Sequence, residues 1–298
     1  MTKIINVRKK RRKRKLSNVL FDIFLYTFLI LVAAVTLVPF LQVLTISMSP
    51  QSVVAKSGLH LIPTKFDFSG YEKVFHYPLV WTAYLNTIIR AALGTGLSVL
   101  LYIIGAYPLS KKYLPHKKAW TLFVIFTMYF SGGLIPGYLL IKDLGMINSR
   151  LSLILPGAVS TFNLMIMITG FEGIPESLEE SARIDGAGDW TILFRIIMPL
   201  AKPTIMVILL YYAVGHWNAW FHAMIYLRDA DKMPLQIFLR DILTRSQLGA
   251  MTGQTDVEDV GQTIKYATII VSTVPILCVY PFIQKHFVKG VMIGAVKE

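Results

Sequence analysis

Long apolar runs constrain this chain more than any other feature of its sequence. A helix needs roughly 20 residues to cross the hydrocarbon core of a bilayer. Six runs approach or exceed that length, at residues 20–46, 81–109, 119–141, 151–171, 204–227 and 263–283. Backbone polar groups in lipid must be satisfied within the protein, which favours helices. The sequence therefore predicts an all-α polytopic membrane protein with six transmembrane helices, the first an uncleaved anchor.

Basic residues are concentrated at the N-terminus. Residues 1–16 contain nine Lys and Arg side chains and no acid, and they account for most of the net charge of +13. A basic block directly before an apolar run favours anionic lipid headgroups. A nucleic-acid tail is the alternative, but the adjoining membrane span argues against a nucleic-acid partner. We assign residues 1–18 to a basic cytoplasmic segment and residues 19–298 to the transmembrane domain.

The distribution of Lys and Arg also predicts the orientation. With the N-terminus inside, the inner segments hold 19 of these residues and the outer segments hold 10. This agrees with the positive-inside rule and places both termini and the loop 172–203 in the cytoplasm. Arg90 is the only formal charge well inside a predicted span. Such a charge must either snorkel to the interface or face a cavity.

Several kinds of chemistry lack their sequence signatures. The single cysteine, Cys278, excludes a disulfide framework and a cysteine-based metal site. There is no P-loop pattern, so the chain itself should not bind ATP. No series of Asp, Glu and His runs through the spans, as an ion-coupled carrier would need. We expect no catalytic, metal or cofactor site on this chain. A membrane-embedded enzyme remains the alternative from another class.

Two local patterns predict departures from straight spans. Residues 130–136, with the sequence FSGGLIP, should break or kink the third span. Residues 235–243 should form a short amphipathic helix on the outer surface. That helix is either a simple interfacial helix or part of a platform for a solute-binding protein.

The loop 172–203 is a polar hinge between apolar runs. Pro175 suits the first turn of a helix, and the acids that follow it favour the helix dipole. Gly186 should end this helix by adopting a positive φ, and Asp189 should cap a second short helix. On these residues alone, an ordinary surface loop and a docking element are equally compatible with the pattern.

The same loop carries a family motif. Residues 180–187, ESARIDGA, and residues 196–199, IIMP, resemble the EAA loop of binding-protein-dependent ABC importer permeases. Ser181 and Met198 depart from the usual Ala and Leu but keep their size class. The resemblance implies the type I ABC importer permease fold, with the loop acting as a coupling helix on the ATPase subunit. It assigns ATPase coupling to Glu180, Ser181, Ala182, Asp185, Gly186, Ala187 and Pro199.

Further segments are similar to one subgroup, the LplC-like, maltose-type permeases of Gram-positive carbohydrate importers. These segments are Asn86-Thr87, 131–136, 144–146, 153–158 and 215–221. The resemblance implies a heterodimer with a second permease, two ATPase subunits that hold ATP and Mg, and an extracellular lipid-anchored solute-binding protein. It also implies an oligosaccharide substrate and a multi-pass location in the cell membrane. A permease of this class for a non-sugar solute is the nearest alternative.

Polar and aromatic residues within the spans are candidates for the translocation path. Such residues usually face a bundle interior or water, and amides beside aromatic rings suit sugars. The alternative is that they join helices, including those of the partner permease. The candidates for path or permease interface are Asn86, Asn163, His216, Trp217, Asn218 and Trp220.

Overall fold

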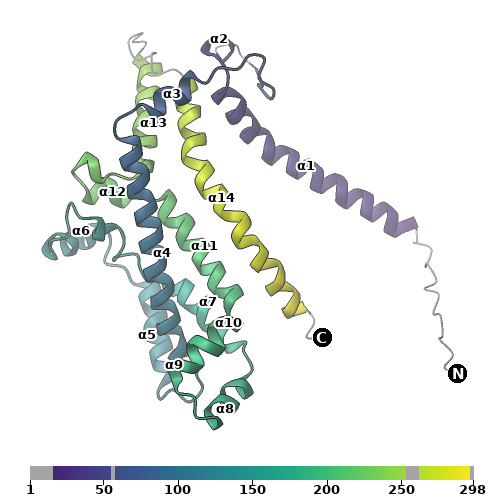
Figure 1. The fold of residues 1–298 in the computed structure, drawn as a ribbon, viewed down its shortest axis with the longest axis vertical. Coiled ribbons are helices and arrows are strands. Elements are labelled where there is room, and N and C mark those ends of the chain that lie inside the picture. Colours follow the sequence, from purple (N-terminus) through teal and green to yellow (C-terminus); the bar gives the residue numbers. More distant parts are fainter. Residues whose placement is uncertain (1–15, 55–57, 253–261, 296–298) are drawn as a thin grey trace.

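The described residues form a helical bundle without strands (Figure 1). The computed structural model describes residues 16–54, 58–252 and 262–295. Three helices are long and apolar enough to cross a membrane, or up to five spans if each of two bent pairs is counted as one. The three are α1 (Leu16–Ser47), α4 (Val80–Ser110) and α14 (Gln262–Ala295). The expected all-α membrane fold is confirmed, whereas the count of six spans stays a prediction.

The third predicted span is broken where the sequence indicates. It consists of α5 (Lys117–Tyr129) and α6 (Leu134–Asp143), which are bent by 107° relative to each other. Gly133 lies in the break with a φ of +86°, a conformation that glycine adopts without strain. A single straight helix over this run would be incorrect.

The fourth predicted span is not one helix. Residues 151–171 contain the end of η1 (Arg150–Leu153), a non-helical connection, and then α7 (Thr161–Glu172). Pro156, in that connection, has no N–H to continue a helix. With 12 residues α7 is about 18 Å long, well short of a bilayer core.

The fifth predicted span is also interrupted. Its long part is α11 (Lys202–Asn218), and the shorter α12 (Phe221–Tyr226) follows after a break. The backbone is extended at Ala219, the residue after the end of α11. This break matters because it exposes a backbone carbonyl in the middle of the bundle, where another helix can use it.

The main core lies where α4, α7 and α11 pack together (Figure 1). Tyr102 on α4 is fully buried, and its hydroxyl shares a hydrogen bond with the hydroxyl of Tyr212 on α11. The same hydroxyl accepts a hydrogen bond from the backbone N–H of Ser160 at 2.5 Å, just before α7. Three helices are therefore joined at one buried polar point.

The two ends of the bundle carry different short helices (Figure 1). At one end lie α8 (Glu176–Ile184), α9 (Asp189–Ile192), the π-helical turn η2 (Leu193–Ile197) and α10 (Met198–Leu200). The remaining elements are α2 (Gln51–Val54), α3 (Ser69–Phe75), η3 (Ala230–Lys232) and α13 (Leu235–Thr252). Of these, α3 and α13 lie at the opposite end from α8. The helix expected at 235–243 is confirmed and continues further than expected. Its place on the outer surface stays a prediction.

The first long helix, α1, lies apart from the others over most of its length (Figure 1). Among the described elements, α1 contacts mainly α14. Most of its side chains are both apolar and exposed. A helix that is apolar on all sides and lacks protein neighbours requires a non-aqueous environment. This arrangement agrees with a lipid-facing membrane anchor.

Candidate coupling loop and membrane cavity

The first helix of the loop 172–203, α8, ends in a Schellman motif. Gly186 has a φ of +82° and lies two residues after the end of α8. Its N–H donates to the carbonyl of Arg183 at 3.0 Å, and the N–H of Ala187 donates to the carbonyl of Ala182 at 2.9 Å. These two bonds satisfy the last carbonyls of the helix. The predicted role of Gly186 as a helix terminator is confirmed.

The second helix begins one residue earlier than the predicted cap implies. Gly188 is the N-cap of α9, and Asp189 is its first helical residue, so the assignment of Asp189 as the cap is wrong. The carboxylate of Asp189 accepts instead a hydrogen bond from Arg183 at 2.5 Å. Arg183 also donates to the hydroxyl of Tyr113 at 2.8 Å. The guanidinium therefore links the turn between the two helices to Tyr113, in the connection between α4 and α5.

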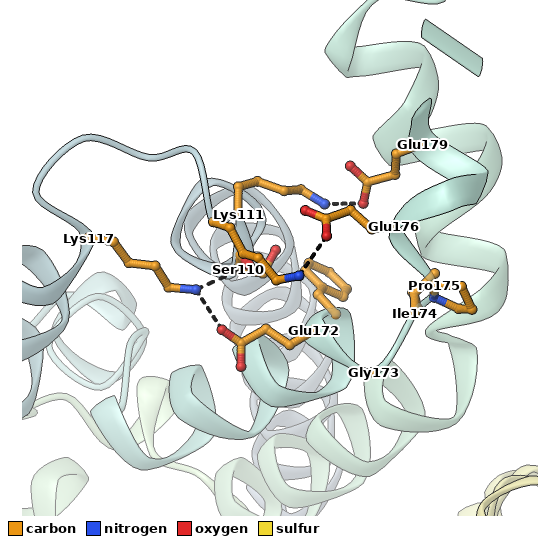
Figure 2. A pocket seen from close by; sticks show the side chains of 11 residues that line it. Ser110, Lys111, Lys117, Glu172, Gly173, Ile174, Pro175, Glu176 and Glu179 are labelled. Carbon is orange, nitrogen blue, oxygen red and sulfur yellow. Dashed lines mark hydrogen bonds and ion pairs between the residues drawn. The ribbon is translucent and has the colours of Figure 1, made fainter. Parts of the chain in front are cut away.

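Three Lys–Glu ion pairs connect α8 and the end of α7 to the connection between α4 and α5 (Figure 2). Lys111 pairs with Glu179, and both side chains are only 8% exposed. Lys112 and Glu176 form an exposed pair at 2.7 Å.

The third pair joins Lys117 to Glu172 at 2.7 Å. Lys117 also donates to the carbonyl of Ser110 at 3.2 Å, at the end of α4 (Figure 2). The three pairs line a cavity of about 600 Å³. We did not predict them from the sequence, although three Lys at residues 111–117 and three Glu at residues 172–179 are a signal for such pairing.

The exposed pair has perturbed acid–base properties. The hydrogen bond from Lys112, followed by the lysine charge, lowers the pKa of Glu176 below its usual value. The same bond raises the pKa of Lys112. Each group therefore favours the charged form of the other over the neutral pH range.

The residues to which the family motif assigns coupling form an accessible surface on α8 and the turn after it. Glu180, Ser181, Asp185 and Gly186 are exposed. Apolar side chains lie beside them, since Ile184 is 86% exposed and Trp190 on α9 is 63% exposed. Large exposed apolar side chains next to polar ones are typical of an interaction site.

The other half of the motif reaches into the protein core. Ala182 and Ala187 are half-buried and pack against the main core. Ile192, Leu193 and Ile197, on α9 and η2, are fully or almost fully buried in it. The loop is therefore one body with the bundle.

The π-helical turn η2 ends two residues before Pro199, the last residue of the motif. The N–H of Met198 donates to the carbonyl of Leu193, five residues back. Pro199 is exposed and has no N–H to donate. Single π turns inside helices occur frequently at functional sites. Here the turn lies between the exposed surface of α8 and the start of α11, where the helix axis bends by 80°.

A second cavity, of about 340 Å³, lies within the bundle. It is lined by residues from α4, η1, α7, α11 and α12 and the connections between them, namely Arg90, Ser152, Leu153, Pro156, Gly157, Asn163, Tyr211, Tyr212, Gly215, His216, Ala219 and His222. Of the candidates named from the sequence, Asn163 and His216 line this cavity. Tyr211 and His222 are lining residues that the sequence did not single out.

The other candidates lie elsewhere. The amide of Asn86 donates to the carbonyls of Asp231 at 2.6 Å and Met233 at 3.1 Å, and its oxygen accepts from Arg150 at 3.0 Å. The indole of Trp217 donates to the carbonyl of Ser272 on α14 at 2.9 Å.

Two further candidates are placed at the end of α11. Asn218 is its exposed last residue, and Trp220 lies with its ring 4.7 Å from the guanidinium of Arg240 on α13. Asn86, Trp217 and Trp220 therefore make contacts within this chain. A role for these residues at the partner permease or in the path stays a prediction.

Arg90 is the most unusual side chain of the cavity. It is 5% exposed, and its Nη1 donates to the carbonyl of Ala219 at 2.7 Å, at the break after α11. Its buried Nε has no hydrogen-bond partner among the described residues. Of the two expectations for this charge, the structure supports a cavity-facing position over snorkelling.

The fold, the loop and the motif together define a transport permease, and comparisons with known proteins identify its family. Residues 3–293 match the family described as binding-protein-dependent transport system inner membrane component, and the chain belongs to this family. The permease protein YtcP of Bacillus subtilis, of a polygalacturonan/rhamnogalacturonan transport system, is 42% identical over 95% of this chain and 100% of its own length. Protein LplC of the same organism is 41% identical over 93% of this chain and 95% of its own.

A solved structure supports the same assignment. A chain of a bacterial ABC transporter involved in the import of the acidic polysaccharide alginate is 34% identical, with a TM-score of 0.81. The match covers 93% of this chain and 99% of that chain. The protein is thus a membrane-embedded permease subunit of an ABC importer, as the motif in residues 172–203 predicts.

Proposed function

We propose that this chain is one of two permease subunits of an ATP-driven importer for an oligosaccharide. In this proposal the second permease completes the path, and two ATPase subunits hold ATP and Mg and perform the hydrolysis. An extracellular lipid-anchored solute-binding protein delivers the cargo. The complex lies in the plasma membrane of a Gram-positive bacterium, with both termini of this chain in the cytoplasm.

The observation that carries the coupling role is the dual character of the loop 172–203. One side of it, with Ser181, Ile184 and Gly186, is exposed. The other side, with Ile192 and Ile197, is buried in the main core. A partner that binds the exposed side of the loop can therefore move the bundle as a rigid body.

The proposed cycle follows from this connection. ATP binding closes the ATPase pair and draws the coupling helices of the two permeases together. The motion passes through η2 to α11 and α4, and the cavity between these helices changes from one exposure to the other. This is a rigid-body population shift whose driving force is the differential affinity of the ATPases for the two states.

The cargo class has its own support. The descriptions of two relatives name a polygalacturonan/rhamnogalacturonan transport system and a transporter involved in the import of alginate, and all of these are polysaccharides. The cavity of about 340 Å³ is lined by Tyr211, Tyr212 and Asn163 among others. Aromatic rings contact the C–H faces of sugars, and an amide can bind a hydroxyl group.

Site-directed cross-linking tests the coupling role. In a Cys278→Ser background, Ser181→Cys places a thiol on the exposed side of α8, and Ser131→Cys places one in the exposed break between α5 and α6. In the assembled transporter we expect Ser181→Cys to cross-link to an ATPase subunit with a yield that changes on ATP addition. Ser131→Cys is the matched control and should give no such product.

The outcome is decisive because assembly is checked independently. If co-purification shows all subunits present and Ser181→Cys gives no more product than Ser131→Cys, α8 is not the coupling helix. Uptake of labelled oligosaccharide, dependent on ATP and on the binding protein, tests the cargo class separately.

A further inference from the structure

The cavity within the bundle carries positive charge without a negative counterpart. Arg90 lines it together with two imidazoles, those of His216 and His222, and no carboxylate is among its lining residues. The sequence has no Asp or Glu between residues 73 and 142, between 144 and 171, or between 190 and 228. The one acid on α4, α7, α11 and α12 is Glu172, the last residue of α7, which pairs with Lys117 and does not line this site.

Arg90 is fixed in place but only partly satisfied. It is the eleventh residue of α4, so it lies roughly 15 Å along the helix from Val80. That depth is near the middle of a bilayer core about 30 Å thick. One of its N–H groups binds the carbonyl of Ala219, which orients the guanidinium, and the buried Nε has no partner among the described residues. A guanidinium has five N–H donors in a planar fork.

The neighbouring polar groups suit the same kind of ligand. The amide of Asn163 and the hydroxyl of Tyr211 can donate hydrogen bonds, and the imidazoles of His216 and His222 each have an N–H in either tautomer. These residues come from three helices and line one space. Hydrogen-bond donors around an oriented guanidinium are the usual surroundings of a bound carboxylate.

From these observations we infer that Arg90 is the anion-selecting residue of the transport cavity, and that the cargo is an oligosaccharide bearing carboxylates, such as an oligouronate. This inference rests on the proposed function, because it assigns the charge of the cargo that the importer moves. In the occupied cavity the guanidinium donates to a carboxylate of the sugar chain, while Tyr211 and Asn163 contact its rings and hydroxyls. The cargo supplies the negative charge that the helices lack, and a neutral sugar leaves the guanidinium uncompensated.

Arg90 also donates to the carbonyl of Ala219, in the break between α11 and α12. A purely structural role at this break is the alternative to charge selection, and the two roles predict different effects of substitution. Such a role needs one donor to the carbonyl of Ala219 and no positive charge. The variant Arg90→Gln keeps an amide donor and removes the charge. The variant Arg90→Lys keeps the charge. Together they separate the two roles.

The experiment uses the complete transporter with its binding protein in proteoliposomes. Uptake is measured for a trigalacturonate and for its fully methyl-esterified form, which differ in charge and share the same sugar chain. The readout is the ratio of acid to ester uptake, normalised to wild type. The same binding protein is present in every reaction, so its own preference cancels when variants are compared.

We expect Arg90→Gln to lower this ratio about tenfold, because a charge-assisted pair with a carboxylate is lost. Arg90→Lys should keep most of the ratio. Asn163→Ala is the matched control in the same cavity; it removes a polar group without changing charge, and it should lower the uptake of both cargoes alike and leave the ratio unchanged.

Four results would overturn the inference. Equal loss of both cargoes in Arg90→Gln, with less assembled complex, identifies Arg90 as a structural clamp. A ratio unchanged in Arg90→Gln excludes charge selection at this residue. Uptake by wild type of the ester and other neutral oligosaccharides, but not the acid, overturns the inference and leaves the importer function standing. Failure of wild type to take up any oligosaccharide, despite cargo-independent ATPase coupling through α8, rejects the proposed cargo class as well.

Discussion

The loop 172–203 and the cavity within the bundle differ in how their buried charges are compensated. At the end of the bundle that carries α8, three lysines each pair with a glutamate, and even the buried Lys111 has Glu179 as its partner. In the cavity, Arg90 is buried as deeply but meets only a backbone carbonyl. A paired charge holds two segments of the chain together. A buried charge with donors to spare is suited to a ligand that brings the opposite charge.

The two regions also differ in why each of them contains a glycine. Gly186 in the coupling loop has a positive φ and open space around it. Gly94 on α4 is helical, and a Cβ there would lie 2.4 Å from Nε2 of His216. The loop needs the conformational freedom of glycine, whereas the bundle needs its small volume.

The largest expected effect comes from breaking the buried ion pair. Lys111→Met leaves the carboxylate of Glu179 buried without its cation, and we expect a loss of about 3–5 kcal/mol in stability. Thermal unfolding of the purified transporter measures it. The double variant Lys111→Met/Glu179→Leu should recover most of the loss, since an apolar pair replaces the buried charges. A single variant as stable as wild type would mean that this pair does not hold the loop.

A smaller effect is expected from crowding in the bundle. Gly94→Ala drives a methyl group into His216 and should cost about 1–3 kcal/mol. Gly96→Ala, two residues further along the same helix, meets nothing within 4 Å and is the control. Thermal unfolding of both variants is compared. If the two variants behave alike, the contact between α4 and α11 at His216 is looser than the structure indicates.

The coupling loop and the bundle also show which features could be predicted from the sequence and which could not. The end of α8 at Gly186 and the break near Gly133 follow from local rules, because glycine itself sets the backbone there. The Lys–Glu pairs and the packing of His216 on Gly94 depend on which helices become neighbours, and no local pattern contains that information.

The same reasoning explains the interruptions of the predicted spans and the contacts of two candidate site residues. Hydropathy predicts one helix over residues 151–171, because apolar content alone does not register the effect of Pro156. Asn86 and Trp217 are polar groups within apolar runs, which suggested a path or an interface. Each instead finds its hydrogen-bond partner within this chain, at a distant point in the sequence.

A third prediction concerns the coupling loop. Gly186→Val places a β-branched residue in the left-handed region and should cost about 1–2 kcal/mol of local helix-end stability. Because Gly186 is exposed and a side chain there meets open space, we expect normal membrane levels and a strong loss of ATP-driven uptake. Gly188→Val is the control, since the φ of Gly188 is −77° and its surroundings are open. Equal uptake by the two variants would contradict a special role for the Schellman turn.

The smallest effect is expected at the exposed pair of Lys112 and Glu176, and it tests whether burial decides the value of a charge here. The lysine lowers the pKa of Glu176. The stabilisation by the pair is therefore fully present above the ordinary pKa of a glutamate and is lost as the pH falls through the lowered value. Both groups are exposed, so solvent and salt screen the interaction.

At neutral pH, Lys112→Ala should leave the melting temperature nearly unchanged, and any difference from wild type should vanish on acidification or in about 1 M salt. If Lys112→Ala instead destabilises the transporter as much as Lys111→Met, the three pairs act as one network. The contrast with Arg90 would then rest on connectivity rather than on burial.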